Sequence, residues 1–169
     1  MMELGSKETF GELFDQAIKM ENEAASIYTE FSRLFSHIPE ISAFWQGMVD
    51  DEILHAKTLE DIRKSLTRQQ LLSPADKDMW ENVARIQRML SKDFIGSIET
   101  LNDAYELAHN LEFSEVNAIF EFLASEFIPS QKRKEFIILQ ITQHLQKLSD
   151  FRRYFGGRDR RKGITIRRV

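Results

Sequence analysis

Hydrophobic residues recur every three or four positions along four long stretches of the chain, which is the spacing of one face of an α-helix. The stretches predict helices over residues 8–35, 40–66, 97–127 and 131–155. Pro39 and Pro129 stand at breaks between them, where proline fits the first turn of a helix or ends the preceding one. Gly156 and Gly157 predict the end of the last helix. We therefore expect an all-α fold.

The segment over residues 67–96, between the second and third predicted helices, is too long for a tight turn. It carries a shorter helical pattern over residues 75–90, after Ser73 and Pro74. A connection of this length lets the third helix enter at the far end of a bundle. The pattern predicts a four-helix bundle with one long crossover that contains a short extra helix. We expect the bundle to span residues 1–155 and a basic C-terminal tail to span 156–169.

The amino-acid composition agrees with a helical domain and limits the kinds of metal site that the chain can form. Of 169 residues, 42% are hydrophobic, with only 7 glycines and 3 prolines. Cysteine is absent, which excludes disulfides, iron–sulfur clusters and cysteine-ligated zinc. The first residues do not have the pattern of a signal peptide, and no apolar run approaches the roughly 20 residues of a membrane span. We expect a cytoplasmic protein.

Charge is unevenly distributed along the chain. The net charge is −4, yet the segment from Arg152 to Val169 holds eight basic residues and one acidic residue, Asp159. Such a tail could contact anionic lipid, nucleic acid or an acidic neighbouring subunit. Residues 164–166 could also add an edge strand in an oligomer. A solvated, disordered tail is the favoured interpretation, and we expect neither nucleic acid nor membrane as a partner.

Each predicted helix carries ionisable residues on its apolar face. They are Glu21 in the first helix, Glu52 and His55 in the second, Glu112 and Glu115 in the third, and His144 in the fourth. Burying an unpaired carboxylate is costly. Ionisable residues at similar depth on four helices therefore suggest a common cause, and cations shared between carboxylates provide one. Glu52 and His55 are three positions apart, so they lie on one face and can reach the same metal ion.

Three segments together resemble the ferritin-like domain of the rubrerythrin family. They are Glu21-Asn22-Glu23-Ala24-Ala25-Ser26-Ile27-Tyr28, Glu52-Ile53-Leu54-His55-Ala56-Lys57, and Glu112-Phe113-Ser114-Glu115 followed by Phe120. The resemblance covers roughly residues 8–155. It implies a pair of metal ions, expected to be iron with manganese or zinc as alternatives. The implied ligands are Glu21, Glu52, His55, Glu112, Glu115 and His144, and the Tyr28 hydroxyl would bond a ligand carboxylate.

The fourth helix departs from the family pattern. His144 stands at the family's histidine position, but Ile141 occupies the position of the glutamate three residues before it. One metal position could therefore be weak or empty, or Glu115 could compensate. A second registration would place Gln143 and Gln146 at these positions. We prefer His144, because that choice preserves the apolar face of the helix.

The resemblance implies reduction of peroxide, or oxidation of ferrous iron. Glu52 would bridge the two ions, and Glu115 would exchange with His144 as the redox state changes. Without cysteine the family's rubredoxin module cannot be present, so an external electron donor would be needed. We expect a homodimer. One alternative is a catalytically degraded metal-binding or structural scaffold that acts through protein interaction, and another is a cage or DNA-protecting assembly.

Overall fold

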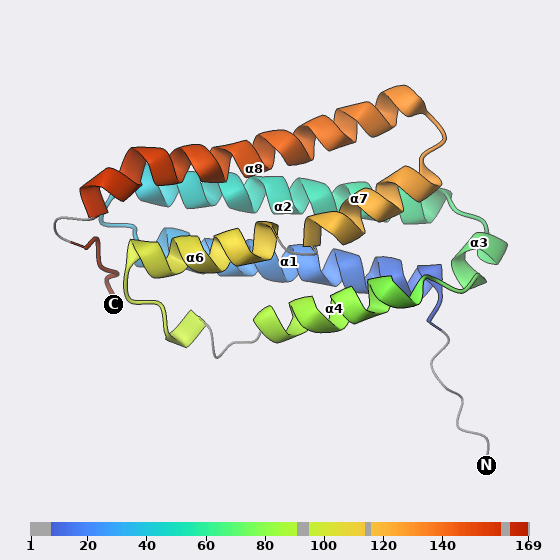
Figure 1. The fold of residues 1–169 in the computed structure, drawn as a ribbon, viewed down its shortest axis with the longest axis horizontal. Helices are drawn as coiled ribbons and strands as arrows, with labels where there is room; N and C mark the ends of the chain where they lie inside the picture. Colours follow the sequence, from blue (N-terminus) through green and yellow to red (C-terminus); the bar gives the residue numbers. More distant parts are fainter. Residues whose placement is uncertain (1–7, 91–94, 114–115, 160–162, 169) are drawn as a thin grey trace, which may run out of the picture.

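The computed structural model describes residues 8–90, 95–113, 116–159 and 163–168, and it is an all-α ferritin-like bundle (Figure 1). Helices α1 (Phe10–Leu34) and α2 (Pro39–Ser65) form an antiparallel hairpin. Helices α6 (Leu101–Glu112) and α7 (Val116–Phe127) follow one another along the third position of the bundle, and α8 (Gln131–Asp159) occupies the fourth. The predicted four-helix architecture is confirmed.

Local signals fix where the first two helices begin. Thr9 and Glu12 form a capping box, in which the Glu12 amide donates to the Thr9 hydroxyl and the Thr9 amide donates to the Glu12 carboxylate. Pro39 stands in the first turn of α2, as predicted. These two helix starts fix the ends of the α1–α2 hairpin, which carries half of the residues expected as metal ligands.

The crossover differs in detail from the prediction, because the structure places two helices in it, α3 (Arg68–Leu72) and α4 (Lys77–Met89). Helix α4 packs beside α1 and α7. Backbone hydrogen bonds hold the crossover to the start of α1: the Phe10 amide donates to Ser73 O at 3.0 Å. At Gly11 a Cβ atom would lie 3.1 Å from the carbonyl oxygen of Leu71, so a side chain there would push α1 and α3 apart.

The prediction of one continuous helix over residues 97–127 is wrong. Helix α6 ends at Glu112, and Phe113 leaves helical geometry at φ −90° and ψ 2°. The Asn117 side-chain amide donates to the backbone carbonyl of Glu112 at 2.6 Å. In a continuous helix that carbonyl would accept from the amide of residue 116. The Asn117 side chain thus satisfies the carbonyl of the last residue of α6, beside the site.

The end of α8 and the tail also differ from the prediction. Helix α8 continues through Gly156 and Gly157 to Asp159, and no glycine in the described ranges has a positive φ. Residues 163–168 pack on their own chain: Thr165 pairs with Thr100, and the Arg167 amide donates to Leu34 O at 3.0 Å. For these residues the prediction of a disordered tail is wrong, and an edge strand in an oligomer stays a prediction. The division at residue 155 stays a prediction.

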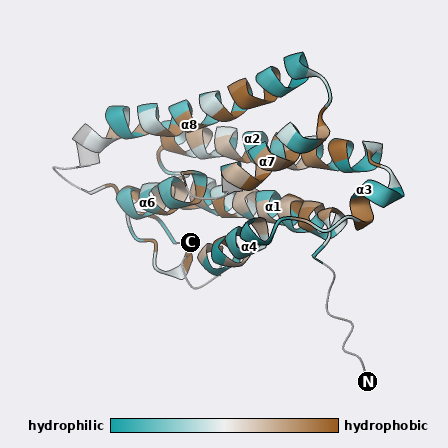
Figure 2. Cartoon of the chain, turned by 45° about the vertical axis from the view of Figure 1, so that its right-hand side comes forward, coloured by the Kyte–Doolittle hydropathy of each residue, from teal (hydrophilic) through white to brown (hydrophobic). Residues whose placement is uncertain are grey.

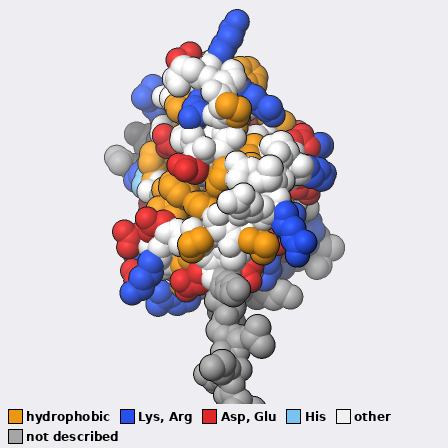
Figure 3. All heavy atoms as spheres, turned by 90° about the vertical axis from the view of Figure 1, so that its right-hand side faces the viewer, with side chains coloured by type: hydrophobic (Ala, Val, Ile, Leu, Met, Phe, Trp, Pro, Cys, Tyr) orange, Lys and Arg blue, Asp and Glu red, His pale blue; other side chains and the backbone are white. Residues whose placement is uncertain are grey.

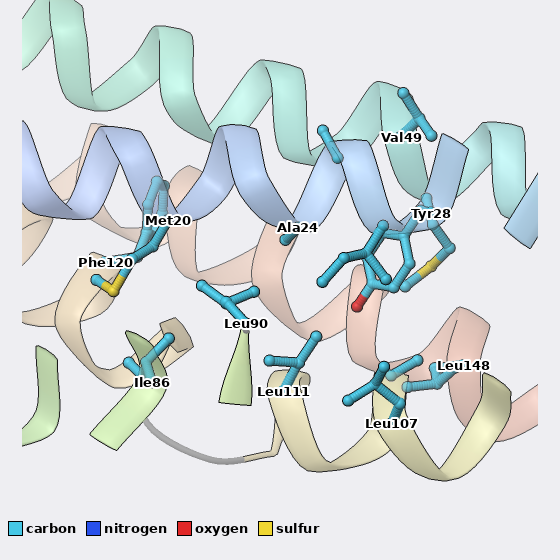
Figure 4. Packing of buried hydrophobic residues seen from close by; sticks show 14 of the residues in the cluster. Met20, Ala24, Tyr28, Val49, Ile86, Leu90, Leu107, Leu111, Phe120 and Leu148 are labelled. Carbon is cyan, nitrogen blue, oxygen red and sulfur yellow. The ribbon is translucent and has the colours of Figure 1, made fainter. Parts of the chain in front are cut away.

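The predicted inward faces form the core. The close view in Figure 4 shows Met20, Ala24 and Tyr28 of α1 among residues from α4, α6, α7 and α8. Polar residues follow the outer side of the helices, as for the teal face of α4 in Figure 2. At the end of the bundle seen in Figure 3, acidic and basic side chains surround a few hydrophobic ones. Within the described ranges, no helix combines the length and apolar character that a membrane span requires.

Candidate metal centre

Five of the six residues expected as ligands lie together in the middle of the bundle. Each is at most 3% exposed. They come from four helices: Glu21 from α1, Glu52 and His55 from α2, Glu112 from α6, and His144 from α8. Glu115 lies outside the described residues. The periodicity placed these five residues correctly because each stands on the apolar face of its helix.

The first group of potential ligands is Glu21, Glu52 and His55. The Nδ1 atom of His55 lies 3.3 Å from Glu52 Oε2 and 3.7 Å from Glu21 Oε2. One oxygen or nitrogen atom from each residue falls within 4.8 Å of the others. Residues on two neighbouring helices thus direct three donor atoms at one point.

The second group is Glu52, Glu112 and His144, and it meets the same criterion of 4.8 Å. The Nε2 atom of His144 lies 3.0 Å from Glu52 Oε1 and 2.9 Å from Glu112 Oε2. Glu52 belongs to both groups, with one oxygen near His55 and the other near His144. Its carboxylate therefore lies between the two groups, where a bridging ligand would stand.

Several of these atoms are close together without forming hydrogen bonds. Glu21 Oε2, Glu52 Oε1 and His144 Nε2 are buried and have no hydrogen-bond partner within the part of the chain that the structure describes. His144 Nε2 forms no hydrogen bond with the two nearby carboxylate oxygens, although both are within 3.0 Å. Unsatisfied buried polar atoms are costly and rare. Lone pairs that converge without hydrogen bonds fit a cation between them.

A set of outer contacts holds the central residues in place. The Tyr28 hydroxyl donates to Glu112 Oε1, as the sequence led us to expect, and the Asn117 amide donates to Glu112 Oε2 at 3.2 Å. On the other side, His144 Nδ1 lies 2.9 Å from Asp51 Oδ2, and Lys147 donates to the same oxygen at 2.6 Å. Such outer partners orient metal-binding residues and fix the histidine tautomer.

Asp51, Asn117 and Lys147 were missed from the sequence. Asp51 directly precedes Glu52, so it points away from the apolar face of α2, and helical periodicity does not single it out. The signal that could have found it is chemical: a ligating histidine usually pairs its second ring nitrogen with a carboxylate. Asn117 was hidden by the assumption of a continuous helix.

Burial and charge shift the protonation of the cluster in the metal-free chain. Burial raises the pKa of Glu21 well above its ordinary value, and burial followed by the Glu52 charge raises the pKa of Glu112. Burial alone would lower the pKa of His55, but the carboxylates of Glu21 and Glu52 raise it to about 10.

Burial and nearby charges also oppose each other in their effects on the pKa values of His144 and Glu52. Burial would lower the pKa of His144, but Glu112 and Asp51 raise it to about 12. Burial would raise the pKa of Glu52, yet its contacts with His144 and His55 hold that pKa far below its ordinary value. Protons on the imidazoles thus supply the positive charge that a metal ion would otherwise supply.

The structure also settles the registration of α8. Ile141 is 5% exposed and packs in the core one turn before His144. Gln143 and Gln146 are exposed, so the second registration is wrong. Helix α8 therefore brings one donor residue to the cluster, because Ile141 has no donor atom.

Comparison with known proteins agrees with the arrangement of the first three bundle positions. The model of the family described as Rubrerythrin matches residues 12–133, which include Glu21, Glu52, His55 and Glu112. His144 lies beyond the matched segment, on the helix that departs from the family pattern. Neither the curated proteins nor the solved structures gave a significant match. Since the family match covers well over half of the chain, this protein belongs to the rubrerythrin family.

Proposed function

We propose that the chain is a di-metal carboxylate protein of rubrerythrin type that holds two ions, expected to be iron, and reduces peroxide or oxidises ferrous iron. The observation that carries the proposal is the pair of donor groups that share Glu52 and contain unsatisfied buried atoms. Carboxylate and imidazole donors without thiolates suit iron, and manganese or zinc are the alternatives.

The two donor groups assign a role to each residue. Glu21, Glu52 and His55 would hold one ion, and Glu52, Glu112 and His144 the other. Glu115 stays a predicted additional ligand. A bound iron pair would supply electron transfer to peroxide or oxygen. Peroxide reduction to water consumes two protons and two electrons, and the electrons would come from an external donor, because the chain has no cysteine-bound iron centre of its own.

The protein residues around the cluster would keep the donors aligned and the site dry. Tyr28 holds one oxygen of Glu112 by its hydroxyl, which leaves the other oxygen facing His144. Asp51 accepts from His144 Nδ1–H, so that the Nε2 lone pair would face the cluster once a metal ion displaces the second ring proton. Phe120 covers His55, with ring centroids 4.9 Å apart. Asp51 is 23% exposed, so it links a buried imidazole to solvent, from which a proton can arrive.

Metal quantification with peroxide turnover tests the proposal. After anaerobic loading with ferrous iron and removal of unbound metal, we expect about two ions per chain, as in the di-metal carboxylate bundles of ferritin-like proteins. We also expect peroxide consumption with a chemical reductant present. Less than one ion per chain would overturn the proposal. The expected homodimer and cytoplasmic location stay predictions.

One observation favours a second candidate. Ile141 is buried where a further carboxylate would complete the site, so the second ion could bind weakly and turnover could be lost. The protein would then be a metal-binding or structural scaffold that acts through protein interaction. Binding of a single ion without peroxide consumption would favour this candidate over the first.

A further inference from the structure

A pocket of about 670 Å³ opens between the start of α6 and the C-terminal part of α8, at the end of the bundle where the described C-terminal residues also lie (Figure 1). It is lined by Thr100, Leu101, Asn102, Tyr105, Phe151, Arg152, Arg153, Phe155, Gly156 and Gly163. Its volume falls within the range of small-molecule sites in proteins. The cluster of carboxylates and histidines does not use any of these residues.

The floor of the pocket is apolar and well packed. Leu101, Tyr105, Phe151 and Phe155 are each at most 8% exposed. The Phe151 ring stacks on Phe44 with centroids 3.8 Å apart, which fixes it from below. A rigid floor of aromatic rings favours a ligand with a flat apolar body, because such rings stack at little cost in conformational freedom.

The rim of the pocket carries positive charge. The Arg152 guanidinium lies 5.0 Å above the Tyr105 ring, and its ion pair with Glu106 is long, at 4.0 Å. Arg153 pairs with Asp150 at 3.6 Å. The Arg152 side chain is 58% exposed, so its planar set of donors is available for an acidic group.

The start of α6 does not supply this charge. Two amides of its first turn have partners: Leu101 N donates to Ile164 O at 2.8 Å, and Asp103 N donates to the Thr100 hydroxyl at 3.2 Å. The Asp103 carboxylate accepts from the Thr100 amide and adds negative charge there. Arg152 and Arg153 are the basic side chains among the described residues that line the pocket, and they would recognise an anion.

We propose that this pocket binds a small organic anion with a flat aromatic body, its ring on the floor and its acidic group at Arg152 and Arg153. The site does not depend on metal binding. It is structurally connected to the metal centre, because the Phe151 and Trp45 rings lie 5.5 Å apart and Trp45 stacks on Tyr28 at 5.7 Å. The Phe151 ring would therefore lie between Trp45 and a ligand on the pocket floor, and the fluorescence of Trp45 would report binding.

The aromatic sulfonate anilinonaphthalene sulfonate tests the proposal, and the uncharged phenylnaphthylamine is the matched probe without the acidic group. A Trp80→Phe background leaves Trp45 as the sole tryptophan. We expect one sulfonate to bind per chain, with quenching of Trp45, and the uncharged probe to bind at least several-fold more weakly. Equal affinity for both probes, or many bound sulfonates per chain, would contradict recognition by this pocket.

Two variants with matched controls locate the site. Arg152→Gln should weaken sulfonate binding about fivefold, the range of a partly exposed charge contact. Gly156→Leu should abolish it by filling the pocket, and among the described residues a Cβ at Gly156 would meet Arg152 Cγ, at 3.6 Å. Arg133→Gln removes a charge elsewhere on α8, and Gly47→Leu adds a side chain where a Cβ meets no atom within 4 Å. Wild-type affinity in both pocket variants, or equal loss in both controls, would overturn the proposal. Circular dichroism of every variant checks the fold.

Discussion

The Nδ1 atom of His144 lies 2.9 Å from the Asp51 carboxylate, and this contact turns the opposite ring nitrogen toward Glu52 and Glu112. Asp51 itself is held by Lys147. Helix α8 offers a single donor to the cluster, so the orientation of that donor depends on one residue of α2. The incomplete half of the site is thus held by a contact between helices.

Asp51→Asn should weaken metal binding at the half that contains His144. The variant keeps an oxygen acceptor but loses the charge that fixes the imidazole tautomer. We expect the affinity of the weaker ion to fall about 10- to 100-fold, as for other partners of ligating histidines. A competition titration with a coloured chelator measures the change. Asp50→Asn is the matched control, since Asp50 is exposed. Equal effects in both variants would show that only net charge matters.

Tyr28→Phe should destabilise the protein and loosen Glu112. The hydroxyl and its carboxylate partner are both buried, so its loss leaves a carboxylate oxygen unsatisfied. We expect a loss of about 1–3 kcal/mol in the free energy of unfolding, measured by urea denaturation of the metal-free protein. Tyr105→Phe is the control, because Tyr105 is also buried and precedes Glu112 on α6 by about two turns. A loss no larger than that of the control would contradict the role of this contact.

The metal-free protein should lose stability as the pH rises from about 6.5 toward 10. The pKa of His55 is raised to about 10, and that of His144 to about 12. A raised pKa in the folded state contributes stability that is complete below the unfolded value of about 6.5 and is lost as the pH rises through the folded value. Glu21 and Glu112, whose pKa values are also raised, act in the same direction from a lower pH.

Thermal unfolding at several pH values measures this loss. Each proton retained only by the folded state should lower the free energy of unfolding by up to about 1.4 kcal/mol per pH unit. The metal-loaded protein should show a smaller slope, because metal binding displaces the imidazole protons. A Tm of the metal-free protein that is constant or rises between pH 7 and 9 would contradict the assignment.

Ile141→Glu tests whether the site is degraded. The added carboxylate should raise the affinity of the second ion and lower the stability of the metal-free protein, since an unpaired carboxylate would enter the core. Ile137→Glu is the control, because Ile137 is 3% exposed on the same face one turn earlier; it should destabilise without adding metal. A large gain in iron and peroxide turnover would indicate a degraded site. No gain would indicate that the native ligands, Glu115 included, are sufficient.

The central part of the site could be predicted because it follows from local periodicity. Glu21, Glu52, His55, Glu112 and His144 interrupt apolar faces at regular helical positions, and burial follows from position on the face. The same reasoning placed Ile141 in the core.

The remaining features involve contacts between segments that are distant in sequence, or side chains that bond to main-chain groups. Asp51 meets His144 across two helices, and its position beside the apolar face gave no periodic signal. The Glu112 carbonyl at the end of α6 accepts from the Asn117 side-chain amide, and apolar periodicity gives no sign of this contact. Thr165 pairs with Thr100, 65 positions earlier, so composition alone suggested a free tail.

The most direct test of the central claim is a crystal structure of the iron-loaded protein with anomalous diffraction measured on both sides of the iron edge. We predict two iron peaks, one among Glu21, Glu52 and His55 and the other among Glu52, Glu112 and His144, with Glu52 between them. The peak beside His144 should be the weaker one, because Ile141 provides no donor. Absence of iron from both groups, or iron bound elsewhere while His144 Nε2 still lies within about 3 Å of Glu52 and Glu112 with no ion between them, would contradict the account.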